Sequence, residues 1–238
     1  MRKKLIHVAL GLFVAGVFCL AGCGEGGSGS TETNLPLTPT GTEVSLTTFN
    51  GFFTGTAATG SQMSFTITGS DTLGWAYSGS IAFVSDGITT FEGQTVTQVR
   101  IISTLTRTAT GASSTGFVTE YFLVSDGNLY KQVNSLGETG VPSSQTPLAD
   151  SARVGDFGNL WNITNSDGTS DTCTWKLDAD FNNNSKLIIS FVSKNLSDVV
   201  IRLEENTFYL DGTGNPYKYA VKITSNGQSL RMSGKRNE

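Results

Sequence analysis

The feature that most constrains the fold is a regular alternation of short strand-like segments and tight-turn dipeptides. From about residue 43 onward, segments such as QMSFTIT (62–68) and KLIISFV (186–192) are rich in β-branched and aromatic residues, which pleated sheets favour. Asp-Gly and Asn-Gly pairs tolerate the positive φ angles of tight hairpins. Such pairs stand between the segments at 86–87, 126–127, 167–168, 211–212 and 226–227. The pattern predicts an antiparallel, all-β domain over residues 43–238.

About a dozen strands can be counted in this domain, and no stretch shows convincing helical periodicity. A sandwich of two sheets and a partly open barrel both fit the pattern, and roughly 190 residues are enough for one core. Each strand alternates polar and apolar residues, with no surplus of apolar residues on both faces. This alternation predicts a filled core, whereas a large apolar cavity would indicate a ligand carrier.

Three short motifs occur twice along the chain in the same order. They favour two tandem β units, at about 62–135 and 162–224. The stretch between the units, 134–158, has no strand pattern and is predicted to be a connector. The repeated pairs are SDTLGW and SDTCTW at 70 and 170, IIS at 101 and 188, and GNLYK and GNPYK at 127 and 214.

The repeat assigns faces to several aromatic residues and to one cysteine. Alternate residues of a strand share a face, so Cys173, Trp175 and Leu177 are predicted to face the core together. Trp75 takes the place of Trp175 in the first unit and is predicted to be buried too. A buried free cysteine behaves as a small apolar residue. Trp161 lies outside the repeated motifs and is the one weak candidate for a ligand-binding aromatic residue.

The first 22 residues differ from the rest of the chain. MRKK is followed by an apolar run over residues 5–22, the layout of a secretory signal peptide. The run has 18 residues, whereas about 20 are needed to cross a bilayer. The segment LAGC (20–23) resembles the lipobox, the cleavage and acylation site of bacterial lipoproteins.

This resemblance implies that Cys23 becomes the first residue of the mature protein. Its sulfur would carry a diacylglycerol and its amine a further acyl chain, with palmitate the expected group. Two lipid signals are enough for stable membrane anchoring. The resemblance also implies a place in the bacterial cell envelope. Because Gly24 stands where inner-membrane lipoproteins commonly carry aspartate, the outer membrane is favoured, on either its periplasmic face or the cell surface.

The residues after the lipobox, up to 42, are predicted to be a linker between the lipid and the domain. The sequence GEGGSGSTETNLPLTPTGT offers nothing that could form a core. A chain of about 19 such residues spans roughly 25 Å. The linker would therefore lift the domain off the lipid headgroups.

Composition excludes several classes of chemistry. Removal of residues 1–22 takes away three of 16 basic residues and leaves 13 against 20 acidic residues, a net charge of −7; this argues against a nucleic-acid partner. The only histidine, His7, leaves with the signal peptide, which excludes histidine-based triads and histidine zinc sites. Cys173 is then the one unmodified thiol, so no intramolecular disulfide can form. No cofactor is expected.

The segment DADFNNN (178–184) is the one candidate for a metal site. Asp178, Asp180 and Asn182 have the spacing of the first ligands in a calcium loop. Asn183 stands where such a loop needs glycine, and Ile189 stands where it needs a bidentate glutamate. A polar hairpin is therefore predicted, and no metal site.

These observations predict a membrane-anchored, exported lipoprotein with a non-enzymatic binding or structural domain. No nucleophile motif or paired thiol points to catalysis. Two alternatives stay open: a carrier of lipids or other apolar ligands, and a carboxylate-based glycan-processing enzyme. The enzyme would need two acidic side chains facing each other in an aromatic cleft. An envelope protein or a glycan is the expected kind of partner.

Overall fold

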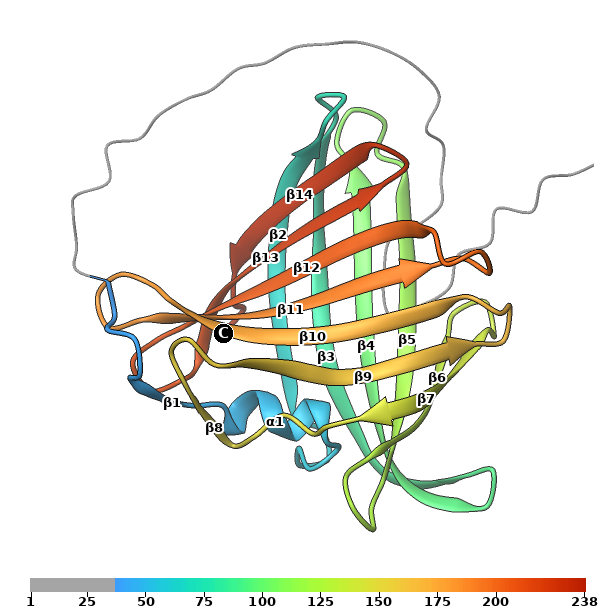
Figure 1. The fold of residues 1–238 in the computed structure, drawn as a ribbon. Helices are drawn as coiled ribbons and strands as arrows, with labels where there is room; N and C mark the ends of the chain where they lie inside the picture. Colours follow the sequence, from blue (N-terminus) through green and yellow to red (C-terminus); the bar gives the residue numbers. More distant parts are fainter. Residues whose placement is uncertain (1–36) are drawn as a thin grey trace, which may run out of the picture.

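The computed structural model describes residues 37–238, and the signal peptide, Cys23 and most of the linker lie outside these residues. The described chain is almost entirely β structure with one short helix (Figure 1). No helix in this part of the chain is long and apolar enough to span a bilayer. In chain order the elements are β1 (Glu43–Ser45), α1 (Thr47–Phe53), β2 (Gln62–Asp71), β3 (Ala76–Phe91), β4 (Gln94–Arg107), β5 (Ser113–Leu123), β6 (Leu129–Asn134), β7 (Thr139–Gln145), β8 (Ser151–Arg153), β9 (Phe157–Asn165), β10 (Ser170–Ala179), β11 (Ser185–Lys194), β12 (Val200–Leu210), β13 (Pro216–Ser225) and β14 (Gln228–Lys235).

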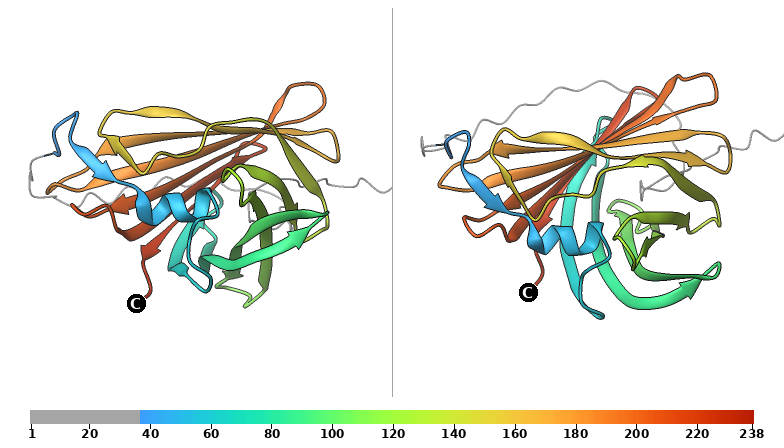
Figure 2. Two further views of the ribbon diagram at one scale, coloured as in Figure 1. Left: turned by 90° about the horizontal axis from the view of Figure 1, so that it is seen from below. Right: turned by 60° about the horizontal axis from the view of Figure 1, so that its bottom comes forward.

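Twelve strands form one closed antiparallel barrel, in the order β10-β11-β12-β13-β14-β2-β3-β4-β5-β6-β7-β9. The prediction of an all-β fold with about a dozen strands is confirmed, and the barrel is closed instead of partly open. The strands β9 to β14 form one broad face, and β2 to β5 cross behind it at a steep angle (Figures 1 and 2). The barrel is therefore flattened, with two faces packed against each other.

Glycines permit the close seam between β2 and β14, where the first barrel strand meets the last. A Cβ atom at Gly69 would lie 1.9 Å from the carbonyl oxygen of Arg231. A Cβ atom at Gly234 would lie 1.7 Å from the carbonyl oxygen of Thr66. Neither position can accept a side chain without moving the neighbouring backbone, as is typical where two strands approach closely. These two glycines therefore help to close the barrel.

The stretch 134–158 is not the irregular connector that the sequence predicts. It contains β7, which pairs with β6 on one side and β9 on the other and completes the barrel. The strand is hard to recognise because its sequence, TGVPSSQ, contains a proline and few apolar residues. Pro142 lies at a register shift in the pairing with β9, one of the few places where a sheet accepts proline.

The two repeated segments contribute strands to the same barrel, and their motifs occupy different local structures. Trp75 lies in the turn between β2 and β3 and is 41% exposed, so its predicted burial in a strand is wrong. The turn forms because Gly74 has a φ of 80°, whereas the matching residue in β10 is Thr174. The IIS motifs are also out of phase, since Ile101 belongs to the core cluster and its counterpart Ile188 does not. A common origin of the two segments stays a prediction.

The helix α1 fills the space between the two faces with phenylalanine rings. Phe49 meets Phe208 of β12 at a centroid distance of 4.7 Å. Phe53 stacks at 6.2 Å on Trp161 of β9, and Phe52 lies 6.4 Å from Phe83 of β3. The helix is thus held by its apolar side chains inside the barrel.

Candidate functional site

Inside the barrel, polar side chains follow the strand register from β5 around to β12. Glu120 lies opposite Gln132 on the neighbouring strand. On β10, β11 and β12, Asp171 lies opposite Ser193, and Ser193 lies opposite Arg202. All these strands belong to the closed barrel, so the residues form a band of polar groups, which are buried except for the half-buried Arg202. The polar belt consists of Glu120, Gln132, Asn165, Asp171, Ser193, Arg202 and Glu204.

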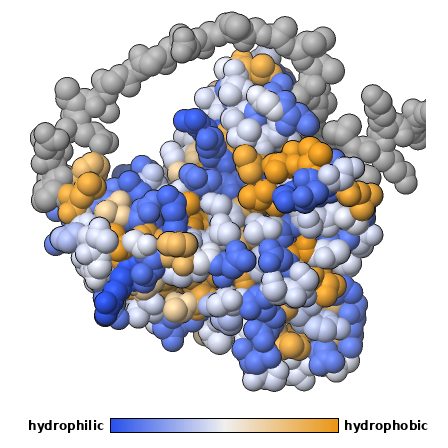
Figure 3. Space-filling model, in the orientation of Figure 1, coloured by the Kyte–Doolittle hydropathy of each residue, from blue (hydrophilic) through white to orange (hydrophobic). Residues whose placement is uncertain are grey.

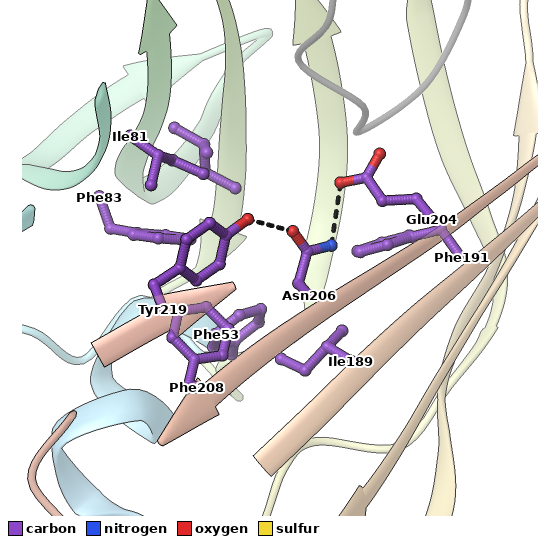
Figure 4. A pocket seen from close by; sticks show the side chains of 10 residues that line it. Phe53, Ile81, Phe83, Ile189, Phe191, Glu204, Asn206, Phe208 and Tyr219 are labelled. Atoms are coloured by element: carbon purple, nitrogen blue, oxygen red, sulfur yellow. Dashed lines mark hydrogen bonds between the residues drawn. The ribbon is translucent and has the colours of Figure 1, made fainter. Parts of the chain in front are cut away.

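Two carboxyl groups of the polar belt are well supplied with hydrogen bonds. Asp171 accepts hydrogen bonds from Asn165 Nδ2 at 2.6 Å and from Ser193 Oγ at 2.5 Å. Glu204 accepts hydrogen bonds from Arg202 Nη2 at 2.5 Å and from Asn206 Nδ2 at 2.9 Å (Figure 4). Burial nevertheless raises the pKa of Asp171, although its two donors act to lower it. These bonds offset part of the cost of burying charged groups.

Glu120 differs from these two hydrogen-bonded carboxyl groups. Its side chain is 1% exposed, and its Oε1 atom has no hydrogen-bond partner among the described residues. The same holds for Oε1 of Gln132 and Oδ1 of Asn165. Burial raises the pKa of Glu120 to about 8. The side chain is therefore an uncharged carboxylic acid at neutral pH.

Cys173 is fully buried next to this belt, as predicted. Burial raises the pKa of its thiol well above the usual value, and the nearby carboxyl groups of Glu120, Glu204 and Asp171 raise it further. A thiol of this kind stays protonated and is a poor nucleophile. Its role is therefore packing.

The segment 178–184 forms the polar hairpin predicted for it. Asn182 and Asn183 have φ angles of 61° and 59° and make the turn between β10 and β11. Asp180 pairs with Lys186 at 2.9 Å, and Asp178 pairs with a lysine of its own strand. Among residues 37–238, no group of three or more His, Cys, Asp or Glu side chains is arranged to hold a metal ion.

The barrel interior holds one small cavity among the aromatic side chains of its core. A cavity of about 30 Å³ lies between aromatic rings such as Phe208 and Tyr219 and the polar side chains Glu204 and Asn206 (Figure 4). This is room for about one water molecule. Trp161, the weak ligand-binding candidate, is 3% exposed and packs in the core. This cavity is therefore too small for a ligand of ordinary size.

A much larger hollow, the outer groove, lies on the outer face of β12, β13, β14 and β2. Its volume is about 540 Å³, within the usual range of roughly 300–1,000 Å³ for ligand sites. Its floor is one row of short side chains that lie opposite one another on successive strands: Thr207, Ala220, Ser233 and Thr68. The absence of long side chains along this row makes the face concave.

Two rows of cations border the floor. Lys222 lies opposite Arg231 on one side, and Lys218 lies opposite Lys235 on the other. Each row is two residues along the strand from Ala220, and residues two apart point to the same face. At roughly 3.4 Å per residue, the rows are about 14 Å apart. Figure 3 shows hydrophilic residues over β13 and β14 on this face, and an apolar area beside them where β11 meets β12.

The outer groove carries more positive than negative side chains. Like charges directly opposite each other destabilise a strand pair. Within residues 37–238, none of the four cations forms an ion pair with a carboxylate. Glu205, which lies opposite Lys222 on β12, is the single acidic residue among those that line the groove. Tyr209 lies beside the cations, with its ring centroid 4.4 Å from Nζ of Lys218.

No family model, curated protein or solved structure matches the chain. The function therefore has to be inferred from the chemistry of the site itself.

Sequence reasoning missed the outer groove, although one signal for it is visible in the sequence. Residues 216–236 contain five basic residues and no acidic residue, in a chain whose formal net charge is −4. A charge count over short windows would have found this segment. The arrangement in two rows could not have been found, because it depends on the register between β13 and β14. The basic residues are Lys218, Lys222, Arg231, Lys235 and Arg236.

Proposed function

We propose that the chain is a lipid-anchored protein of the bacterial cell envelope whose barrel is a non-enzymatic binding module. Its ligand site would be the outer groove. The observation that supports this most is the contrast between about 30 Å³ of space inside the barrel and about 540 Å³ in the outer groove. Ligand sites need roughly 300–1,000 Å³, so the groove is the better place for a ligand.

Anchoring is proposed through Cys23, on the strength of the lipobox-like segment 20–23 and the outer-membrane preference drawn from Gly24. The chain that follows reaches the barrel at the hairpin between β10 and β11. There Thr38 donates hydrogen bonds from its backbone N–H and its hydroxyl to the carbonyl oxygen of Asp180, at 2.9 and 3.0 Å. This contact gives the lipid tether one fixed point of attachment on the domain.

The two alternative functions have less support. A carrier of apolar ligands would need a large apolar interior, whereas the cavity among the core aromatic side chains has a volume of about 30 Å³. A glycan-processing enzyme would need two carboxyl groups within reach of a sugar chain. The buried carboxyls Glu120, Asp171 and Glu204 lie inside the barrel, and Glu205 lines the outer groove without an acidic partner among its lining residues. Binding therefore fits the site better than catalysis.

The anchor is tested by replacing Cys23 with serine. We expect the wild-type protein to be processed at Cys23 and to sediment with membranes, whereas the Cys23→Ser protein should stay unprocessed and carry no lipid. Metabolic labelling with palmitate and fractionation of the envelope would measure both properties. Processing and palmitate labelling of the Cys23→Ser protein to the wild-type level would contradict the proposed anchor.

The binding site is tested by filling the groove. Ala220→Trp places a large ring on the floor, and Thr115→Trp places the same ring on the outer face of β5 as a control. The full-length proteins, in detergent, are incubated with labelled polysaccharide and lipid fractions from the envelope of the producing bacterium. We expect one fraction to be retained by the wild type and the control but lost with Ala220→Trp. Equal retention by all three proteins, or none by the wild type, would contradict the proposal.

A further inference from the structure

The arrangement of charge in the outer groove indicates the class of its ligand. We propose that the groove binds an anionic polysaccharide, which lies along the floor across β12, β13, β14 and β2. Its acidic groups would contact the two rows of cations. This inference rests on the proposed function, because it names the ligand of the same groove.

The first argument is the charge itself. Lys222 faces Arg231, and Lys218 faces Lys235, across the β13–β14 pair. Two such like-charged pairs oppose strand pairing, and Glu205, opposite Lys222 on β12, offsets only one of them. They occur in a chain with more acidic than basic residues overall. An anion between the cations would relieve the repulsion. Lysine and arginine are the side chains that bind carboxylate, sulfate and phosphate groups by charge-assisted hydrogen bonds.

The second argument is the shape of the groove. The floor crosses four neighbouring strands, and at roughly 4.8 Å per step it is about 14 Å long. The cation rows run parallel to it, about 7 Å away on either side. A linear polymer can lie along such a trough and contact both rows. A flat bilayer would touch only the rims, because the floor of short side chains is recessed.

The third argument is the chemistry of the floor. Thr207, Ser233 and Thr68 present hydroxyl groups, which both donate and accept hydrogen bonds. Tyr209 adds a half-buried aromatic ring at one end, with an apolar face and a polar edge. Hydroxyls, one ring and flanking cations suit a sugar chain with acidic groups. A single-stranded nucleic acid would instead need several stacking rings, and the groove has one.

Binding is tested with the full-length protein in detergent and four labelled probes. Polygalacturonate is an anionic glycan, dextran is a neutral glycan, polyphosphate is an anionic polymer without sugars, and phosphatidylglycerol vesicles present an anionic membrane. We expect polygalacturonate to bind, with affinity that falls as salt is raised, and dextran to bind at least tenfold more weakly. Stronger binding of the vesicles or of polyphosphate than of polygalacturonate would overturn the polysaccharide assignment.

The site is tested with two double variants of equal charge. Lys222→Gln with Arg231→Gln removes one row of cations, and we expect at least tenfold weaker binding of polygalacturonate. The control, Lys176→Gln with Lys194→Gln, removes two positive charges that are already paired with Asp178 and Asp198. It should bind within threefold of the wild type. Equal weakening in both variants would show a general charge effect and overturn the site.

Thermal unfolding separates loss of binding from loss of folding. Removal of the repulsion between Lys222 and Arg231 offsets the loss of the cross-strand pairing of Lys222 with Glu205, so the melting temperature of the groove variant should stay close to that of the wild type. The outcomes also separate this inference from the proposed function. If polygalacturonate does not bind but Ala220→Trp still blocks an envelope fraction, the ligand class is wrong and the groove remains the site. If no envelope fraction binds, both proposals fail.

Discussion

The two parts of the barrel interior are held together in different ways. In the apolar part, Phe208 contacts Phe49, Phe65 and Phe83 at ring-centroid distances of 4.7, 6.1 and 5.7 Å, and burial of such side chains stabilises the fold. In the polar belt, hydrogen bonds offset the cost of burying polar groups only in part. Glu120 shows this most clearly, since its Oε1 has no partner among the described residues. The comparison predicts that the apolar part supplies most of the stability, whereas the belt makes that stability depend on pH.

The largest expected effect comes from the apolar part. Phe208→Ala removes the ring that touches α1, β2, β3 and β13, and we expect the free energy of unfolding to fall by about 3–5 kcal/mol, the usual range for a core aromatic residue. Denaturant unfolding measures this change. Phe157→Ala is the matched control, because Phe157 is 81% exposed, and it should change stability by less than about 0.5 kcal/mol. Similar losses in both variants would remove the contrast between core and surface.

The second expected effect comes from the polar belt, where a substitution should raise stability at neutral pH. The pKa of Glu120 is raised from 4.5 to about 8, so the folded state keeps a proton that the unfolded chain releases. Stability should therefore be full below about pH 4.5 and fall as pH rises toward 8. At about 1.4 kcal/mol per pH unit, the loss between pH 5 and pH 7.5 is about 3 kcal/mol.

Glu120→Gln tests this by removing the titration while keeping the shape of the side chain. We expect the variant to match the wild type near pH 5 and to be about 3 kcal/mol more stable at pH 7.5. Denaturant unfolding at the two pH values gives both numbers. A wild-type slope that persists in the variant would assign the pH dependence to another group.

The smallest expected change in stability comes from Cys173, and it tests where the apolar part of the interior ends and the polar belt begins. Cys173 lies opposite Trp161 and Phe191 on its neighbouring strands, and Asp171 is two residues away on the same face. Cys173→Ala should cost about 1 kcal/mol through lost packing. Cys173→Ser should cost about 1–2 kcal/mol more, because its hydroxyl would be buried without a partner. If serine is tolerated better than alanine, the polar belt extends as far as residue 173.

Several features of the fold were predictable because they depend on residues close together in the chain. The alternation along β10 correctly placed Cys173 and Leu177 in the core, whereas Trp175, predicted to share their face, is only partly buried against it. The polar hairpin over 178–184 was predicted because the segment lacks the glycine and the bidentate glutamate of a calcium loop. The same local reasoning failed at Trp75, where a motif shared with β10 lies in a turn that Gly74 permits.

The sequence by itself determined an all-β domain, the approximate number of strands and the presence of a basic segment near the C-terminus. Only the tertiary structure decided that the sheet closes, since closure joins Leu230 of β14 to Asp71 of β2 and inserts the inconspicuous strand β7 between β6 and β9. The same long-range register assembled the polar belt and set the cations of the outer groove in two rows. The physical reason is that the alternation of a strand specifies its two faces but not its neighbours. The pairing partners are selected by packing of the twisted strands around a shared core.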